Sequence, residues 1–347
     1  MRFPTRLAIA VTALRVVLIP TLLVLAVRQL SGWQHGSGAA TLVLLAVYLV
    51  WIYLGAAWAY LNYWGRYILP PFFLTAGLLS IGSARPPAPD SAVYGLWWVL
   101  PLLLLALTLY FLILVAACIQ GRRYRGVPIG LRRPLEGRRF YVLQGGSNAS
   151  VNYHGRFAES QRYALDIVAL SAAGTRAASS APRRAEEYWI HGAPLLCPCD
   201  GLVVESADGC SDEPRAGGAA EGNHVWIQSG DAYILMAHLS KGSVLVRVGE
   251  QVVAGQPVGR VGASGNATEP HLHIHAVRPA ADPSQTMAWR LAHGEPVPLL
   301  IDGEFLVRNQ TFGRRQVGDL AEEDPAHRRQ ARGRHQDGLA GDSGQAG

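Results

Sequence analysis

The first third of the chain contains almost no charge. Between residues 7 and 120 the charged side chains are only Arg15, Arg28, Arg66, Arg85 and Asp90. Nearly all of the 31 basic and 25 acidic residues of the 347-residue chain therefore lie outside this stretch. A wholly soluble protein is excluded by this distribution, and a disordered chain is excluded because half of the residues are hydrophobic. The sequence predicts a membrane-embedded half followed by a water-soluble half.

Lysine is also nearly absent. Lys241 is the only lysine, so the net charge of +6 comes almost entirely from arginine. The arginines are scattered through predicted loops and tails, and the sequence contains no recognisable nucleic-acid-binding module. We therefore expect no nucleic-acid partner. The basic balance favours attraction to an anionic polymer or to a lipid surface.

The N-terminal half, residues 1–120, is predicted to be an α-helical transmembrane bundle in the lipid bilayer. A spanning helix needs about 20 mostly apolar residues. The third candidate is short and contains Pro70 and Pro71, so three spans are the alternative to four. We interpret this half as an anchor, and the sequence does not identify a regulatory membrane partner. The four predicted spans are residues 7–30, 38–64, 67–83 and 92–119.

The C-terminal half is predicted to be an all-β, antiparallel domain. Residues 121–139 are interpreted as a basic linker, residues 140–311 as the folded domain and residues 312–347 as a disordered tail. Short apolar or alternating runs separated by glycine-bearing turns are typical of such a domain. The expected strands are residues 140–143, 202–205, 225–228, 233–237, 244–248 and 271–277.

Histidines provide the chemical signal in this half. His271 and His273 are two residues apart on a predicted strand, so their side chains project from the same face. His238 ends another predicted strand, and His154 and Asp166 lie upstream. Three nitrogen or oxygen ligands with an open fourth position are what a catalytic zinc ion requires. A histidine–aspartate–histidine set supplies such ligands.

Four segments of this half resemble the M23 (lysostaphin/LytM-type) zinc metallopeptidases. They are residues 222–227 (GNHVWI), 237–240 (AHLS), the glycine-valine repeat at 248–266 and residues 269–273 (EPHLH). The resemblance extends over roughly residues 140–305 and is most specific at 237–273, where order and spacing both match. It implies a compact, mostly antiparallel β fold with one catalytic zinc ion in a groove.

The resemblance also implies roles for individual residues. It assigns His154, Asp166 and His273 as zinc ligands, and His238 and His271 as catalytic histidines without a bond to the metal. One imidazole would accept the proton of the attacking water and pass it to the leaving amine. The other would form a hydrogen bond to the developing oxyanion. The sequence leaves open which histidine has which role.

The first zinc ligand departs from the common pattern of the family. Eleven residues separate His154 from Asp166, whereas three are common in the family. The intervening loop must therefore fold back to bring His154 to the metal. His191 is the alternative first ligand, although it follows the aspartate and lies in a glycine-proline turn.

Two states remain open for the cysteines of the soluble half. Cys210 can form a disulfide with Cys197 or with Cys199, which would leave one thiol free. All three can equally be free thiols. Their spacing matches no common zinc motif.

The predicted function is that of a membrane-anchored zinc endopeptidase that hydrolyses peptide bonds, with peptidoglycan cross-links as the substrate implied by the resemblance. The alternatives are a non-catalytic module that binds the cell wall or regulates hydrolases, and a peptidase acting on a protein substrate. We expect a multi-pass protein of the cell membrane with an extracytoplasmic peptidase domain. The arginines that follow the last predicted span favour the cytoplasm instead, by the positive-inside rule. These are Arg122, Arg123 and Arg125.

Overall fold

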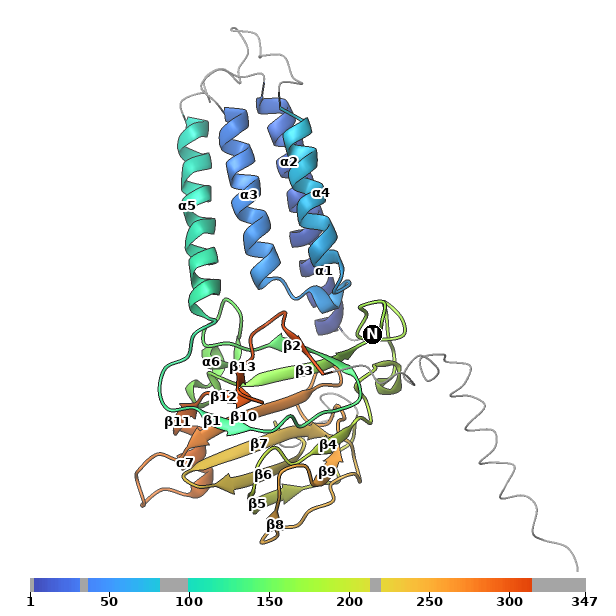
Figure 1. Cartoon of the computed structure of the whole chain (residues 1–347), viewed down its shortest axis with the longest axis vertical. Helices are drawn as coiled ribbons and strands as arrows, with labels where there is room; N and C mark the ends of the chain where they lie inside the picture. The colour runs from blue at the N-terminus through green and yellow to red at the C-terminus, as the bar shows by residue number, and fades with distance from the viewer. Residues whose placement is uncertain (1–2, 32–36, 82–98, 213–219, 314–347) are drawn as a thin grey trace, which may run out of the picture.

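The structure is a computed structural model that describes residues 3–31, 37–81, 99–212 and 220–313. An N-terminal helical bundle precedes a C-terminal β domain (Figure 1), which confirms the predicted fold class. The elements of the N-terminal part are α1 (Phe3–Ala13), the π-helical turn η1 (Leu14–Leu18), α2 (Ile19–Leu30), α3 (Ser37–Gly55), the 3-10 turn η3 (Trp58–Tyr60), α4 (Gly65–Leu79) and α5 (Val99–Gln120).

In the bundle, α3 packs against α2, α4 and α5. Gly77 of α4 allows a close approach to α3, because a Cβ atom there would lie 2.7 Å from Leu45 Cδ2. The Tyr48 hydroxyl donates a hydrogen bond of 2.9 Å to the carbonyl oxygen of Arg15, inside the π-helical turn. The buried core of the bundle consists of Val16, Leu45, Tyr48, Leu49, Ile52, Ala56, Trp58 and Phe73.

Three helical segments are long and apolar enough to cross a membrane. They are Arg6–Leu30, Ser37–Gly55 and Val99–Gln120, with 25, 19 and 22 residues. The span predicted at residues 67–83 corresponds to α4, which has only 15 residues. At 1.5 Å per residue such a helix is about 22 Å long, shorter than the roughly 30 Å of a hydrocarbon core. Within the described residues α4 is therefore short for a spanning helix, although it packs against α3 and runs along the bundle to the end away from the β domain (Figure 1).

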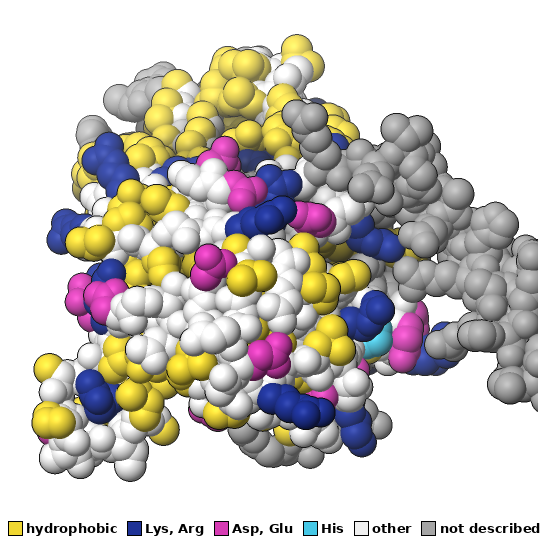
Figure 2. All heavy atoms as spheres, turned by 60° about the horizontal axis from the view of Figure 1, so that its bottom comes forward, with side chains coloured by type: hydrophobic (Ala, Val, Ile, Leu, Met, Phe, Trp, Pro, Cys, Tyr) yellow, Lys and Arg dark blue, Asp and Glu magenta, His cyan; other side chains and the backbone are white. Residues whose placement is uncertain are grey.

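The surfaces of the two halves differ in the same way as their sequences. Large apolar side chains lie exposed along the helices, among them Leu79, Leu102 and Ile113. In Figure 2, hydrophobic side chains cover the helices at the top, whereas basic and acidic side chains are interspersed on the β domain. Exposed apolar helices of this kind suit a lipid environment.

The β domain is built on one long antiparallel sheet with the strand order β14-β2-β3-β10-β7-β6-β5-β8, and β11 pairs with β10. Two small sheets, β1-β12-β13 and β4-β9, accompany it. The strands are β1 (Ile129–Leu131), β2 (Arg139–Gln144), β3 (Leu165–Leu170), β4 (Pro194–Leu196), β5 (Gly201–Ala207), β6 (Asn223–Ser229), β7 (Ala232–Leu239), β8 (Gln251–Val252), β9 (Pro257–Arg260), β10 (Leu272–Arg278), β11 (Glu295–Val297), β12 (Leu299–Ile301), β13 (Glu304–Phe305) and β14 (Thr311–Phe312). The short helical elements are α6 (His154–Phe157), η5 (Glu159–Gln161), η6 (Ala185–Glu187) and α7 (Met287–Ala292).

One face of the long sheet packs against the small sheets and forms the main core. Alternate residues of each strand point into this core, as the two-residue period of a strand requires. In β10, for example, Leu272, Ile274 and Ala276 belong to the core, and so does Leu195 of β4. The residues between them in β10 therefore face the opposite side of the sheet.

The opposite face of the sheet is covered in two places. At β2 and β3, a cluster that includes Tyr141 and Val168 packs against Ala59 and Tyr63 of the segment between α3 and α4. At β6, β7 and β10, a second cluster packs against Leu291 of α7. The helical half thus supplies part of the cover of the sheet.

Hydrogen bonds also join the membrane half to the β domain. The Arg308 guanidinium donates to the carbonyl oxygen of Gly55 at the end of α3, at 2.9 Å. Arg66 at the start of α4 donates to the carbonyl oxygen of Asn309 at 2.6 Å. The Asn309 side chain donates in turn to the carbonyl oxygen of Leu54, at 3.0 Å. These bonds cross between segments more than 240 residues apart in sequence.

The β domain begins earlier than the predicted boundary at residue 140. Residues 129–131 of the predicted linker form β1, which pairs in parallel with β12. Leu131 and Leu135 are buried in the core, so this segment is part of the fold. Phe312, the first residue of the predicted tail, pairs with Phe140 as part of β14. Residues 314–347 of that tail lie outside the described residues.

Five of the six expected strands are present, but residues 244–248 do not form one. Val246 is buried but Val248, two residues further on, is exposed, so burial does not alternate along the segment as it does in a strand. The segment runs beside β9 as irregular chain, with a hydrogen bond from Leu245 N to the carbonyl oxygen of Val258. Gly242 and Gly249, which both have positive φ, bound the segment.

The four cysteines are free thiols in the structure. Cys118, Cys197 and Cys199 are buried, and Cys210 is partly exposed. The backbone of Cys210 is held by the Asn223 side chain, which accepts from its N–H at 2.7 Å and donates to its carbonyl at 2.9 Å. An amide side chain therefore fixes the loop for which the sequence suggested a disulfide.

Replacing Ile274 by alanine tests whether the core face of β10 is assigned correctly. Ile274 lies between His273 and His275 in β10 and is fully buried. We therefore expect Ile274→Ala to lower the free energy of unfolding by about 2–5 kcal/mol. Thermal unfolding of the detergent-solubilised chain, followed by tryptophan fluorescence, measures the change. Val248→Ala, at an exposed apolar position, is the matched control. Equal effects of the two variants would contradict the assignment.

Candidate active site

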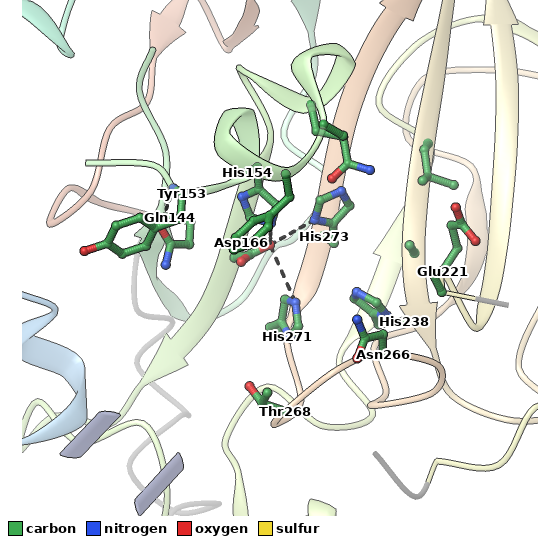
Figure 3. Close-up of a pocket in the computed structure, with 16 residues that line it drawn as sticks. Gln144, Tyr153, His154, Asp166, Glu221, His238, Asn266, Thr268, His271 and His273 are labelled. Atoms are coloured by element: carbon green, nitrogen blue, oxygen red, sulfur yellow. Dashed lines mark hydrogen bonds and ion pairs between the residues drawn. The ribbon is translucent and has the colours of Figure 1, made fainter. Parts of the chain in front are cut away.

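The pairing of β3 with β10 forms the centre of the site. Asp166 on β3 lies directly opposite His273 on β10 in the antiparallel register. His271 precedes β10 on the same side of the sheet, and Figure 3 shows these side chains converging with His154. The apolar residues between the histidines point into the core on the other side, so packing of the sheet fixes the direction of the imidazoles.

His154 reaches the cluster because the chain folds back between it and β3. The helical turn α6 begins at His154 and the 3-10 turn η5 follows, which returns the chain to the start of β3. Ala158 N donates to the His154 carbonyl at 3.0 Å, and Ala164 N donates to the Gln161 carbonyl at 3.0 Å. Two short turns therefore account for the eleven residues between His154 and Asp166.

Asn152 holds this loop and the His154 ring together. Its side-chain NH₂ donates to the carbonyl oxygens of Gly146, Arg162 and Ala164 at 2.9–3.0 Å. Its side-chain oxygen lies 2.9 Å from His154 Nδ1. Because an amide oxygen only accepts, His154 carries its proton on Nδ1. The Nε2 lone pair of His154 is thereby directed toward Asp166, whose Oδ1 is 3.3 Å away.

Asp166 is the electrostatic centre of the site. Its Oδ1 lies 3.0 Å from His273 Nδ1, 3.3 Å from His154 Nε2 and 3.5 Å from His271 Nε2. Burial opposes ionisation, but the neighbouring imidazoles of His154 and His271 and the hydrogen bond from His273 hold the pKa of Asp166 well below its usual range. Asp166 is therefore a carboxylate at neutral pH, which is the form that binds metals.

His154, Asp166 and His273 form a donor set that fits a zinc ion. One donor atom from each residue can be chosen so that all three lie within 4.8 Å of one another. Nitrogen and oxygen ligands about 2.0–2.1 Å from a tetrahedral zinc ion lie about 3.3 Å apart. The separations of 3.0 and 3.3 Å from Asp166 Oδ1 to the two imidazoles match that spacing.

His275 supports the orientation of His273. His273 Nε2 lies 2.9 Å from His275 Nδ1. Burial and the neighbouring imidazoles of His273 and His154 lower the pKa of His275 well below its usual value, so His275 is neutral. A metal on Nδ1 of His273 requires its proton on Nε2, and His275 Nδ1 can then accept that hydrogen bond.

His238 and His271 stand beside this donor set, each held through Nδ1 by a backbone carbonyl. Their ring centroids are 4.8 Å apart. His238 Nδ1 lies 2.9 Å from the carbonyl oxygen of Ser264, and His271 Nδ1 lies 2.8 Å from that of Glu269. Carbonyl oxygens only accept, so both rings carry their proton on Nδ1. Burial, and then the His271 and His273 imidazoles, lower the pKa of His238 well below its usual value.

A groove of about 590 Å³ opens over these residues. Gln144 and Tyr153 lie on one side of the cluster, and Glu221 and Asn266 lie near His238 on the other (Figure 3). The groove is therefore lined by amide, hydroxyl and carboxylate groups around the imidazoles. Such groups can form hydrogen bonds to an extended peptide.

The structure brings the five predicted site residues together and separates them from His191. His191 Nε2 lies 3.6 Å from Asp212 Oδ2, and His191 does not line the groove. Within the described part of the chain, one group of histidine and acidic side chains could hold a metal ion. It consists of His154, Asp166 and His273. Sequence reasoning missed the role of Asn152, although its position two residues before His154 was visible.

Comparison with known proteins finds similarity to one family of peptidases. The model of peptidase family M23 matches residues 189–285. The peptidoglycan DD-endopeptidase ShyA of Vibrio cholerae is 38% identical over 87 residues, which are 25% of this chain and 18% of that protein. The peptidoglycan DD-endopeptidase ShyC of the same organism is 35% identical over 83 residues, 24% of this chain and 17% of that protein. Residues 189–285 therefore resemble peptidase family M23.

Among solved structures, the catalytic domain of the antimicrobial peptidase lysostaphin from Staphylococcus simulans aligns with 46% of this chain and 87% of that one, with 19% identity and a TM-score of 0.26. The chain spans less than a fifth of the length of the two curated relatives. The M23 match includes His238, His271 and His273 but not His154 or Asp166. The structure supplies those two residues from α6 and β3, which precede the matched region.

Replacing Asn152 tests how the first imidazole is held. We expect Asn152→Ala to weaken zinc binding by about 10–100-fold, because the ring of His154 loses its hydrogen-bond partner. Competition with a chromophoric chelator measures the affinity of the full chain. Asn266→Ala, which changes another groove amide, should leave the affinity within about twofold. Unchanged affinity in Asn152→Ala would show that the ring is held by other contacts.

Proposed function

We propose that this protein is a membrane-anchored zinc endopeptidase that hydrolyses peptide bonds in peptidoglycan cross-links. The observation that carries the proposal is the convergence of a buried histidine–aspartate–histidine donor set with two further imidazoles in one groove. The M23 match and the names of the two Vibrio cholerae relatives support the reaction class and the substrate. The exposed apolar helices support the anchor.

In this proposal, His154, Asp166 and His273 hold one zinc ion. A zinc ion bound there supplies a Lewis acid that polarises the scissile carbonyl and makes water a nucleophile at neutral pH. Asn152 and His275 orient the two ligand imidazoles through their second nitrogens. The donor set leaves room for substrate because only three protein side chains contribute to it.

His238 and His271 move the proton in this proposal. In its neutral form, each ring presents an unprotonated Nε2, because its single proton is on Nδ1 and is held by a backbone carbonyl. Such a nitrogen can accept the proton of the attacking water. Once protonated, the same Nε2 becomes a donor that can stabilise the oxyanion or deliver the proton to the leaving amine. The distance of 4.8 Å between the ring centroids lets both imidazoles act on one substrate bond.

A peptidoglycan substrate requires the M23 domain to face the extracytoplasmic side. In Figure 1 the start of α1 and the β domain lie at the same end of the helical bundle. We therefore place both on the outer side of the membrane. Under this proposal the arginines after α5 contact the lipid surface from outside, against the positive-inside bias.

Digestion of sacculi tests the proposed reaction. We expect the zinc-loaded full chain in detergent to release muropeptides cut at an amide bond, as identified by mass spectrometry. His271→Ala should lower kcat by about 10²–10⁴-fold, because proton transfer is lost. His273→Ala should release no products because it removes a zinc ligand.

Two other outcomes would contradict this function. Stoichiometric zinc without muropeptide release would favour a peptidase with a protein substrate. Absence of both zinc and products in the wild-type chain would favour a non-catalytic wall-binding or hydrolase-regulating module. His191→Ala, at the histidine outside the groove, is the control variant and should retain wild-type product release.

Thiol labelling tests the proposed orientation. We expect a membrane-impermeant maleimide to label Cys210 in intact spheroplasts, because this thiol is partly exposed whereas the other three are buried. A cysteine introduced by Arg6→Cys near the start of α1 should be labelled from the same side. Cys210→Ser supplies the background. Labelling of Cys210 only after permeabilisation would place the domain in the cytoplasm and exclude a peptidoglycan substrate.

A further inference from the structure

A buried ion pair lies directly behind the candidate active site. Arg176 follows β3, and Glu269 lies two residues before His271. Arg176 Nε is 3.1 Å from both carboxylate oxygens of Glu269, and the two side chains are only 4% and 2% exposed. Burying two charges costs several kcal/mol per ion in lost hydration. Because of this loss of hydration, the pair contributes little to stability on its own, and we looked for another role.

Glu269 connects this pair to His271. The Glu269 carboxylate is held by Arg176, and its backbone carbonyl accepts the Nδ1 proton of His271 at 2.8 Å. This hydrogen bond fixes the tautomer and the rotation of the His271 ring, so that Nε2 faces the groove and Asp166. Displacement of Glu269 would therefore release the ring of the imidazole proposed to move a proton.

The other side of the pair is closed by the membrane half. Arg176 Nη1 lies 3.4 Å from the carbonyl oxygen of Ala59 and 3.5 Å from that of Tyr60. The Arg176 Cζ atom lies 4.8 Å from the centroid of the Tyr60 ring, in a cation–π arrangement. The segment between α3 and α4, residues 56–64, thus covers the guanidinium and keeps water from it.

The same segment is fixed to the turn that carries Arg176. The Asn62 side chain donates to the carbonyl oxygen of Ala173 at 2.8 Å, and Trp64 Nε1 donates to that of Ala172 at 3.0 Å. A Cβ atom on Gly174 would lie 2.7 Å from Trp64 Cδ1, which shows how closely the turn and the indole approach. Continuous contacts therefore run from the membrane half through Arg176 and Glu269 to His271.

We infer that the Arg176–Glu269 pair is a positioning element for His271 and that the segment 56–64 of the membrane half holds it in place. This inference rests on the proposed function, because it assigns His271 a role in proton transfer. The membrane half is then part of the alignment of the active site as well as an anchor. A peptidase domain without this segment would have the pair open to water on one side, where a charge pair is weaker and more mobile.

Two variants of the full chain, in detergent and loaded with zinc, test the two parts of the inference. One addresses the segment 56–64 and the other the Arg176–Glu269 pair. Asn62→Ala combined with Trp64→Phe removes the two side-chain hydrogen bonds that the segment 56–64 donates to the carbonyl groups of residues 172 and 173. Arg176→Met combined with Glu269→Gln replaces the pair by neutral groups of similar volume, which avoids an unpaired buried charge. The control is Arg133→Met with Asp302→Asn, because this pair is also an arginine–carboxylate contact, at 2.7 Å, but neither residue lines the groove.

We expect both test variants to lower kcat by about tenfold or more, with KM and bound zinc unchanged within about twofold, because only the orientation of His271 changes. The control should retain wild-type kcat. Long-range ¹H–¹⁵N spectra of the chain labelled on histidine nitrogens should show His271 as the Nδ1–H form in the wild type and control. The test variants should show a mixture of the two tautomers.

The spectroscopic readout separates this inference from the proposed function. If the wild-type chain releases no products, the proposed function fails, but the tautomer of His271 still reports on the pair. Wild-type kcat and tautomer in the neutral-pair variant would overturn the positioning role of Arg176 and Glu269. Wild-type values in the Asn62/Trp64 variant alone would overturn the role of the membrane half. A variant that loses zinc or unfolds early in the thermal scan is replaced by Arg176→Lys, in which the tautomer mixture is again expected.

Discussion

The antiparallel pairing of β3 with β10 is the constraint on which the site depends. It sets Asp166 opposite His273, and the period of two in β10 then places the neighbouring histidines on the same side while Ile274 enters the core. A slip of one residue would turn the imidazoles into the apolar core and the apolar side chains toward the groove. The apolar packing of one face of the sheet therefore determines the geometry of the polar chemistry on the other.

The second face of the same sheet explains why the helical half and the β domain form one continuous structure. All six residues of β3 are buried, because the core covers one face and the segment between α3 and α4 covers part of the other. A strand covered on both faces loses the alternation that marks a half-exposed strand. This is the physical reason that β3 was not recognised as a strand from the sequence, although it carries Asp166.

Other parts of the site could be predicted from the sequence to the extent that the signal was local. His271 and His273 share a face because of their spacing, whereas the inclusion of His154 rested on a family resemblance. The return of the chain through α6 and η5 depends on Asn152, whose three bonds to carbonyl oxygens are contacts made only after folding. Likewise, β1 has only three residues and lies among basic residues, so the sequence alone does not predict it as a strand. It forms because it pairs in parallel with β12.

The balance of charge in the site bears on the chemistry that it can perform. The donor set contains one carboxylate and two imidazoles, and the rings of His238 and His271 donate their Nδ1 protons to carbonyl oxygens. A divalent ion held by this set would leave one net positive charge beside the groove. Such a charge stabilises an oxyanion more than it stabilises a neutral peptide carbonyl, which is the difference that accelerates amide hydrolysis. Neutral carbonyl groups, and not further carboxylates, orient these imidazoles. The positive charge that favours the oxyanion is therefore not cancelled by them.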